Sequence, residues 1–315
     1  MNKRPGVGRK AWPYIFIAPW IIGFLVFTLG PLILSFVMSF FDWSITGTPK
    51  FRGIGNYVEM FTTDDQVVKS LVISLKYAAI FVPLNLIIAL FLAMLISQPV
   101  KGAKFFRTIF YIPAVISGVA VSIIFGWILN GNYGVLNYLL SLIGIEGPQW
   151  LVDPKWALVA VVLASAFGVG TMMLIFYTDI KNIPIDMYEA AAIDGAGPVR
   201  QFFSITLPMI TPTLLFNLIT SIISSFQQVT LVMLLTNGGP LKSTYFYGLM
   251  TYNNAFKFHK LGYASANAWV MFIIILALTA LVFKSSDMWV FYESTANKSK
   301  GKKKAGRKTR KEMSR

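Results

Sequence analysis

The stretch DMYEAAAIDGAGPVRQFFSITLP, residues 186–208, is the one long segment of small and polar residues between two apolar runs on the side where basic residues predominate. The apolar runs that flank it cover residues 157–177 and 211–235. A helix needs about 20 apolar residues to cross about 30 Å of hydrocarbon, and both runs approach or exceed that length. We call residues 186–208 the polar loop and expect it to connect two membrane helices.

Local signals within the polar loop predict two short helices. Pro184 suits a helix start, and Asp186 followed three residues later by Glu189 has the spacing of a capping box. A first helix through Ile193 is therefore expected. The residues expected to end it and to begin a second short helix are Gly195, Gly197 and Pro198.

An alternative places this first helix flat on the membrane surface. Its apolar face is weak, and it carries the three acidic residues Asp186, Glu189 and Asp194. These would face an anionic inner leaflet, which disfavours that interpretation.

The composition of the whole chain indicates a membrane protein. Apolar residues make up 56% and charged residues only 13%, with a mean hydropathy of +0.64, whereas ordinary soluble domains are about 25% charged. Runs of about 20 apolar residues are typical of membrane helices, while β-barrels show short alternating segments. An all-α membrane protein follows.

Six apolar runs predict six transmembrane helices. They cover residues 12–41, 71–97, 108–129, 157–177, 211–235 and 264–283. With both termini in the cytoplasm, the inner segments collect 20 Lys and Arg residues against seven in the outer ones, the excess that the positive-inside rule requires. We expect a basic N-terminus over residues 1–10, a permease domain over 11–290 with its cytoplasmic coupling loop at 181–208, and a basic tail over 291–315.

Several classes of function are disfavoured by what the sequence lacks. It has no cysteine and a single histidine, His259, so thiol chemistry and histidine-rich metal sites are excluded and no cofactor is expected. No phosphate-binding loop, carboxylate pair or catalytic triad is present, so the chain is not expected to be an enzyme. The basic tail is interpreted as a topology anchor and a contact for anionic membrane lipids rather than for nucleic acid.

The predicted spans contain almost no ionisable residues. Charged groups inside a bilayer are costly and usually mark ion pathways. Their scarcity argues against a proton- or sodium-coupled transporter, and it indicates that the energy for transport comes from another subunit.

The fifth predicted span carries neutral polar residues at helical spacing. Asn217, Ser221, Ser224 and Gln228 are separated by four, three and four residues, so they are expected to share one face. Such a face either bonds to neighbouring helices or lines a path for a neutral hydroxylated solute. The sequence leaves both interpretations open.

The polar loop carries a family resemblance in its spacing: Glu189-Ala190-Ala191, three residues, Gly195, nine residues, Ile205, one residue, then Leu207-Pro208. This resembles the EAA loop of binding-protein-dependent ABC importer permeases. The likeness extends to the sugar branch, similar to the maltose and glycerol-phosphate transporter membrane subunits. It covers APWIIGFLVFTLGPLILSFVMSFFDW from Ala18, FRGIGNYVEMF from Phe51, FFRTIFYIPAVIS from Phe105, LLTNGGP ending at Pro240 and AFKFHKLGYASA ending at Ala266.

The resemblance implies a set of partners and contacts. A second permease subunit, two cytoplasmic ABC ATPase subunits and an extracytoplasmic solute-binding protein are implied. The loop helix, with Glu189, Ala190, Ala191 and Gly195, would dock on the ATPase. A helix continuous through Ile205, Leu207 and Pro208 with span five would carry the movement onward. The TNGGP loop, with Asn237, Gly238, Gly239 and Pro240, would face the outside and help to meet the binding protein, although a plain turn also explains it.

These observations give a functional hypothesis. The chain is expected to be the multi-pass subunit of an ATP-driven sugar or oligosaccharide importer in a bacterial plasma membrane. A stand-alone secondary transporter or channel, and an ABC permease for glycerol phosphate, remain as alternatives. A membrane-embedded enzyme lacks any plausible nucleophile or acid–base group.

Overall fold

The computed structural model describes residues 7–44, 47–98 and 101–291. The described chain is mostly helical and divides into two compact units. The first unit comprises residues up to 70 together with 247–273, and the second comprises 71–246 together with the residues from 274 onward. The predicted basic tail lies almost wholly outside the described residues, as do residues 1–6 of the basic N-terminus.

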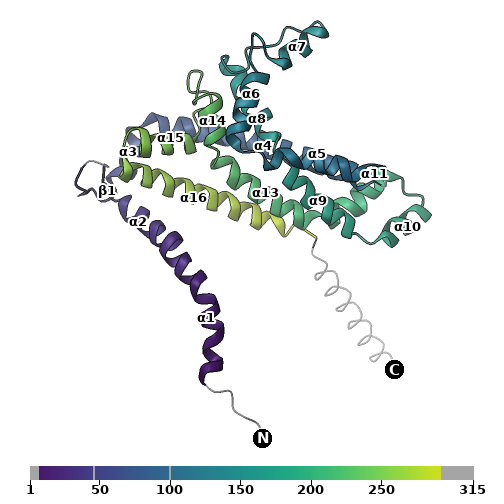
Figure 1. Ribbon diagram of the computed structural model, residues 1–315, viewed down its shortest axis with the longest axis horizontal. Coiled ribbons are helices and arrows are strands. Elements are labelled where there is room, and N and C mark those ends of the chain that lie inside the picture. Colours follow the sequence, from purple (N-terminus) through teal and green to yellow (C-terminus); the bar gives the residue numbers. More distant parts are fainter. Residues whose placement is uncertain (1–6, 45–46, 99–100, 292–315) are drawn as a thin grey trace, which may run out of the picture. The chain divides into compact units, whose positions relative to one another are not determined.

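The first unit contains the N-terminal helices and a short hairpin (Figure 1). Its elements are α1 (Val7–Phe24), the π-helix η1 (Leu25–Leu29), α2 (Gly30–Met38), β1 (Phe41–Asp42), β2 (Lys50–Phe51), α3 (Gly55–Thr62), α15 (Tyr247–Tyr252) and η3 (Asn253–Lys257). The helices α4 (Asp65–Ser97) and α16 (Leu261–Ser286) both begin in this unit.

The first predicted span is a helix that runs through its proline. The π-turn Leu25–Leu29 ends two residues before Pro31, and helix α2 begins at Gly30 and continues beyond the proline. A proline has no N–H, and its ring would clash with the carbonyl four residues earlier. The wider π-turn changes the hydrogen-bond register just before that position, so the helix can continue.

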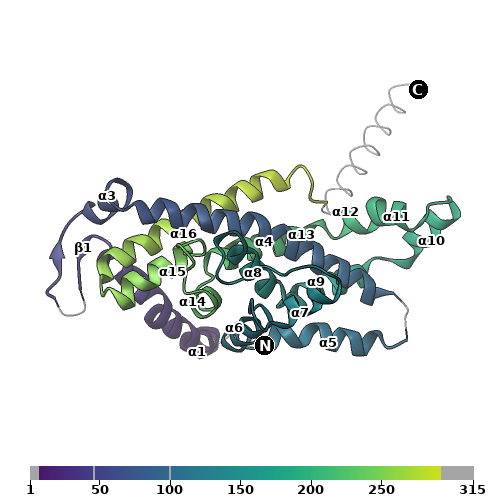
Figure 2. The same ribbon diagram turned by 90° about the horizontal axis from the view of Figure 1, so that it is seen from above.

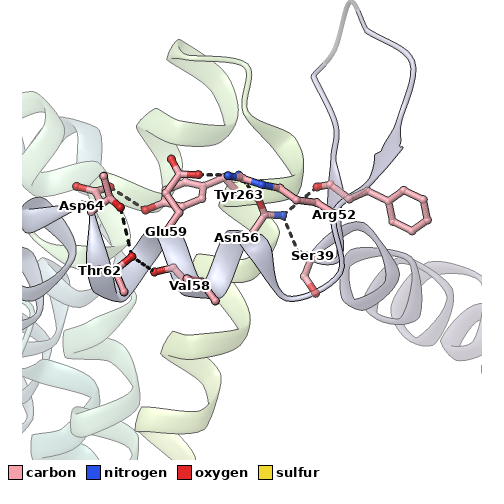
Figure 3. A network of polar contacts seen from close by, with 10 residues as sticks. Ser39, Arg52, Asn56, Val58, Glu59, Thr62, Asp64 and Tyr263 are labelled. Atoms are coloured by element: carbon pink, nitrogen blue, oxygen red, sulfur yellow. Dashed lines mark hydrogen bonds and ion pairs between the residues drawn. The ribbon is translucent and has the colours of Figure 1, made fainter.

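A polar network ties the hairpin, α3 and the start of α16 together (Figure 3). The buried Asn56 side chain donates to the carbonyls of Ser39 and Phe41 at 2.8 and 2.9 Å and accepts from Arg52 at 3.1 Å. Arg52 also pairs with Glu59 at 2.6 Å. Figure 3 shows Tyr263 at the other end of the network, where its hydroxyl donates to Asp64 at 2.8 Å. The side chain of Asn56 thus fixes the turn that follows α2.

The second unit holds the broken helices and the polar loop (Figure 2). Its elements are α5 (Ala103–Val115), α6 (Gly118–Ile128), α7 (Val135–Leu142), α8 (Pro154–Ala166), α9 (Gly170–Asn182), α10 (Ile185–Ile193), α11 (Pro198–Gln201), η2 (Phe202–Thr206), α12 (Leu207–Met209), α13 (Thr211–Phe226) and α14 (Thr230–Leu235).

Three predicted spans are bent or interrupted, which corrects their description as single runs. The pair α5–α6 is bent by 101°, α8–α9 by 52°, and the segment 198–209 meets α13 at 67°. The fifth predicted run is also interrupted at residues 227–229, between α13 and α14. Three helices of the described chain are long and apolar enough to cross a membrane, or up to six if each bent pair is one span. The count of six and the side of each terminus stay predictions.

The core of the second unit lies where α4, α9 and the polar loop meet. Its buried members are Ala89, Ala93, Ile96, Val169, Met173, Phe176, Ile183, Ile205 and Ile210. Small residues on α4 let a neighbouring helix approach closely, as is typical of membrane bundles. The residues that connect α9 to the polar loop are therefore part of the core.

Candidate functional site

The first helix of the polar loop forms as predicted, but its capping differs. Helix α10 follows Pro184, whose backbone is extended, and it ends at Ile193. Asp186 lies within the first turn rather than before it, and no side chain caps this end. The predicted capping box is therefore wrong, because Pro184 already fixes the backbone that turns into the helix. Asp186 is still placed where a negative charge favours the helix dipole.

Helix α10 has an inner and an outer face. Tyr188 and Ala191 pack against the core cluster that includes Ile183 and Ile205. The Tyr188 hydroxyl is hydrogen-bonded to the Thr206 hydroxyl at 2.8 Å. This bond holds α10 against η2, and the sequence offers no signal for it because the two residues are 18 apart.

The outer face of α10 is uncovered within the second unit. Glu189 and Ala190 are exposed, and Ile193 is 87% exposed. The seven residues of the predicted coupling motif therefore fall into two groups. Glu189, Ala190 and Gly195 are available for contact, whereas Ala191 and Ile205 fix the helix to the core and Leu207 and Pro208 are partly buried.

Gly195 adopts the conformation that ends α10. Its φ is +77°, and its N–H bonds to the Ala192 carbonyl at 3.0 Å. This left-handed backbone is favourable for glycine and costs other residues about 1–2 kcal/mol. Gly197, two residues on, has an ordinary φ of −70° and precedes α11. Only Gly195 is required by the backbone of this turn.

The helix from the polar loop into α13 is not continuous, contrary to the sequence-based expectation. The chain bends by 67° at Ile210. Pro208 and Pro212 are four residues apart, so Pro212 cannot supply the N–H that the Pro208 carbonyl would receive in a regular helix. The Thr211 hydroxyl donates to the Pro208 carbonyl instead, at 2.7 Å, and accepts from the Phe291 N–H at 2.9 Å. We call residues 208–212 the elbow.

The four polar residues predicted for one helix face do not all share it. Helix α13 ends at Phe226, so Gln228 lies beyond it. Asn217 and Ser221 are each only 2% exposed, whereas Ser224 is exposed. The buried face continues to Ser225 instead, which the four-residue spacing from Asn217 through Ser221 also allowed.

Two buried polar atoms on this face of α13 are unpaired. The Asn217 Nδ2 and the Ser221 Oγ have no hydrogen-bond partner among the residues that the structure describes. Gln228 contacts the hydroxyl of Tyr77, which also donates to Ser165 at 2.8 Å. The buried face of α13 thus keeps unused hydrogen-bonding capacity.

Two helices that follow breaks in the predicted spans, α6 and α14, pack against each other. Helix α6 contacts α14, and Gly126 lies close to Leu235 in this contact. Two of the interruptions, at Ile116–Ser117 and at residues 227–229, thus precede helices that form one packed pair.

The TNGGP loop is a compact hydrogen-bonded structure. Asn237 and Gly238 have φ values of 50° and 79°, and the Gly239–Pro240 peptide is cis. The Thr244 hydroxyl lies 2.7 Å from the Gly239 carbonyl and 2.7 Å from the Thr236 hydroxyl. Leu241 at the tip is 90% exposed. The loop is therefore more ordered than a plain turn and displays an apolar side chain.

Tyr247 in the first unit lies outside the predicted spans, and its pKa is shifted. Burial, together with the nearby carboxylate of Asp64, raises the pKa of the Tyr247 hydroxyl. It stays protonated and donates to the Asn267 carbonyl at 3.1 Å. Its role in the described residues is structural.

Comparison with known proteins gives consistent matches along the chain. The model of the family described as binding-protein-dependent transport system inner membrane component matches residues 85–290. A probable ABC transporter permease of Bacillus subtilis (strain 168), YesP, is 43% identical over 285 residues, which cover 89% of this chain and 92% of that protein. The sulfoquinovosyl glycerol transport permease SmoG of Agrobacterium fabrum is 33% identical over 282 residues, 88% and 91% of the two chains.

A solved structure has the same fold. The chain is similar to one from a bacterial alginate ABC transporter in complex with an alginate pentasaccharide-bound periplasmic protein. The TM-score is 0.76 at 22% identity, covering 88% of this chain and 95% of that one. The family match and the identity to YesP extend over the broken spans and the polar loop. The chain therefore belongs to the family of binding-protein-dependent transport system inner membrane components, the permeases of ABC transporters.

Proposed function

We propose that this chain is the membrane subunit of an ATP-driven importer for a sugar or oligosaccharide, coupled to a separate ATPase through α10. The observation that carries this proposal is the division of α10 into two faces. Ala191 and Tyr188 hold it to the core, while Glu189 and Ala190 are left uncovered. A docked ATPase would cover this outer face, and its movement would reach the core through the inner one.

The elbow determines how a movement of α10 would be transmitted to α13. A rigid rod from the polar loop into α13 is ruled out by the bend at Ile210. Force on α10 would instead pass through the Tyr188–Thr206 bond and the packing of Ile205, and then turn at Pro208 into α13. We propose that packed groups of helices then move as rigid bodies about hinges. This movement switches the solute path between inward and outward access.

The proposed partners are a second permease subunit, two ATPase subunits and a solute-binding protein. Family membership supports an assembly of this kind. The exposed Leu241, on a loop stiffened by Thr236 and Thr244, is the proposed contact for the binding protein. The periplasmic protein in the alginate transporter structure is a precedent for a carbohydrate-loaded partner of this fold.

The substrate class is proposed from the relatives and from α13. SmoG transports a sugar-glycerol conjugate by its name. In this chain the unpaired atoms of Asn217 and Ser221 are a neutral donor and a hydroxyl. Both could bond to a sugar hydroxyl without fixing a charge, so a carbohydrate is favoured over an ionic solute such as glycerol phosphate.

The coupling proposal is tested with two matched glycine substitutions and one charge reversal. Gly195 and Gly197 are both in open space, but only Gly195 has a positive φ. We expect Gly195→Val and Glu189→Lys to reduce sugar uptake and co-purification of the ATPase, while the chain still inserts. Gly197→Val should leave both nearly unchanged. Normal uptake and ATPase retention in the double variant Glu189→Lys/Gly195→Val would rule out docking through α10.

The proposal that Asn217 and Ser221 line the solute path needs a separate test, because Asn217 could instead bond to a neighbouring helix. We expect Asn217→Leu and Ser221→Ala to raise the substrate concentration needed for half-maximal uptake. Ser225→Ala is the matched control, since the Ser225 hydroxyl already bonds to the Ile222 carbonyl at 2.7 Å. Unchanged apparent affinity with a lowered melting temperature would favour the interhelical interpretation.

A further inference from the structure

Helix α7 forms a fixed cap on the connection between α6 and α8. Its inner residues Leu136 and Leu140 pack against a cluster of Leu129, Trp150 and Ala160. Figure 1 shows α7 beyond the ends of α6 and α8, running across them rather than in line. The cap is therefore a defined part of the second unit.

Asn137 at the centre of α7 locks this arrangement. Its Nδ2 donates to the carbonyls of Gly131 and Pro148 at 2.9 and 3.1 Å, and its Oδ1 accepts from Trp150 Nε1 at 2.6 Å. The Asn137 side chain thus links the segments before and after α7 to one tryptophan, Trp150. The opposite side of the helix is consequently presented in a fixed direction.

The opposite side of α7 and the residues just after the helix expose large apolar side chains. Tyr138 and Leu142 are 63% and 64% exposed, and Ile143 is 70% exposed. We call this surface the α7 face; its residues are Tyr138, Leu139, Leu142, Ile143 and Ile145. An exposed apolar patch of this kind marks contact with a protein or a membrane.

The charge distribution around α7 favours lipid over a protein partner. Between Arg107 and Lys155 the sequence has only two charged residues, Glu146 and Asp153. Protein interfaces of transient complexes usually have a polar rim that sets orientation. The α7 face contains no charged residue. Lipid acyl chains, unlike a protein partner, require no polar rim.

Tryptophans near α7 indicate its depth in the membrane. Trp127 and Trp156 lie at the end of α6 and the start of α8, where aromatic residues collect at membrane–water interfaces. Trp156 packs edge to face on Trp150 with ring centroids 5.1 Å apart, and Trp150 is bonded to Asn137. Helix α7 is thereby held at the level of this aromatic belt.

We infer that α7 lies in the membrane–water interface opposite the polar loop, with the α7 face against lipid acyl chains. Such a helix buries its apolar side about 5–10 Å into the boundary between head groups and chains. The apolar residues Ile123 and Ile124 on α6 are also exposed. The inference requires that the α8–α9 pair crosses the membrane, and it does not depend on the proposed transport function.

The absence of cysteine from the sequence allows a direct test. Single variants Leu142→Cys and Tyr138→Cys of the full chain are spin-labelled and reconstituted into vesicles of phosphatidylcholine and phosphatidylglycerol. Collision rates with oxygen, which partitions into lipid, and with a water-soluble nickel chelate are then measured. Both labels should collide several-fold more with oxygen than with nickel.

Two further labels calibrate the result. Leu241→Cys lies on the exposed TNGGP loop and should favour the nickel chelate, while Ile123→Cys on α6 should favour oxygen. Water-like collision rates at Leu142 and Tyr138 would overturn the inference. Labels shielded from both reagents and immobilised would also overturn it, because the α7 face would then be covered by protein, such as a second copy of the chain.

Discussion

At the scale of single residues, the close approach of α5 and α9 depends on Gly170. A Cβ at this position would lie 2.5 Å from the Phe110 carbonyl oxygen and 2.8 Å from the Tyr111 Cα. Both are backbone atoms, so α5 and α9 would have to separate. We expect Gly170→Ala to lower the free energy of unfolding by about 1–3 kcal/mol, the usual cost of overpacking, measured by thermal unfolding in detergent.

Gly126 on α6 is the matched control for this prediction. A Cβ there meets only Leu235 Cδ1 at an ordinary 3.9 Å. Gly126→Ala should therefore be neutral or slightly stabilising, because alanine is the better helix former. Equal melting temperatures for the two variants would mean that α5 and α9 can shift apart without loss.

Gly195 and Gly170 differ in how far the sequence can reveal their roles. Gly195 was predicted to end a helix, because the left-handed turn there is a local property that follows from its neighbours. Gly170 gives no such signal, since its requirement comes from a helix about 60 residues away. Asn56 is similar: its carbonyl partners on Ser39 and Phe41 are known only once the hairpin is formed.

At the scale of elements, the elbow depends on one hydroxyl. Thr211 donates to the Pro208 carbonyl and accepts from Phe291 N–H. We expect Thr211→Val to remove both hydrogen bonds and to destabilise the protein by about 1–2 kcal/mol, because each bond contributes about 1 kcal/mol net. If α10 is coupled to α13 through the elbow, substrate uptake should fall as well.

Thr211→Ser separates the hydrogen bonds from the packing of the methyl group. The serine hydroxyl can make both bonds, so stability and uptake should recover most of what Thr211→Val loses. A serine variant as unstable as the valine variant would contradict a role for the hydroxyl, and would assign the loss to packing around the methyl group.

Element boundaries were predictable where one local signal dominates. Pro184, Gly195 and Pro198 fix the ends of α10 and α11. The helices α4 and α16 contain the predicted apolar runs 71–97 and 264–283 and extend a few residues beyond them. The breaks were missed because apolar composition is the same on both sides of them. Pro208 and Pro212 were a usable signal for the elbow, but the helix was expected to be continuous. Gln228 was wrongly assigned to the α13 face because the fifth span was also expected to be one unbroken helix.

At the scale of the whole chain, the number of spans and the sides of the connections can be measured with the cysteine-free background. Asp194 in the polar loop and Asn132 in the α6–α8 connection are both exposed. If the α8–α9 pair crosses once, these positions face opposite sides. A membrane-impermeant maleimide added to intact spheroplasts should label Asn132→Cys, and should label Asp194→Cys only after permeabilisation.

The Leu241→Cys variant extends this measurement to the next span. It should behave like Asn132→Cys if the segment 198–226 and α14 together form the fifth span, as predicted. Labelling of Asp194→Cys in intact spheroplasts would reverse the predicted orientation and remove α10 from any cytoplasmic ATPase. Labelling of all three from one side would reduce the bent pairs to re-entrant loops, and the broken helices would then enter and leave the bilayer on the same side.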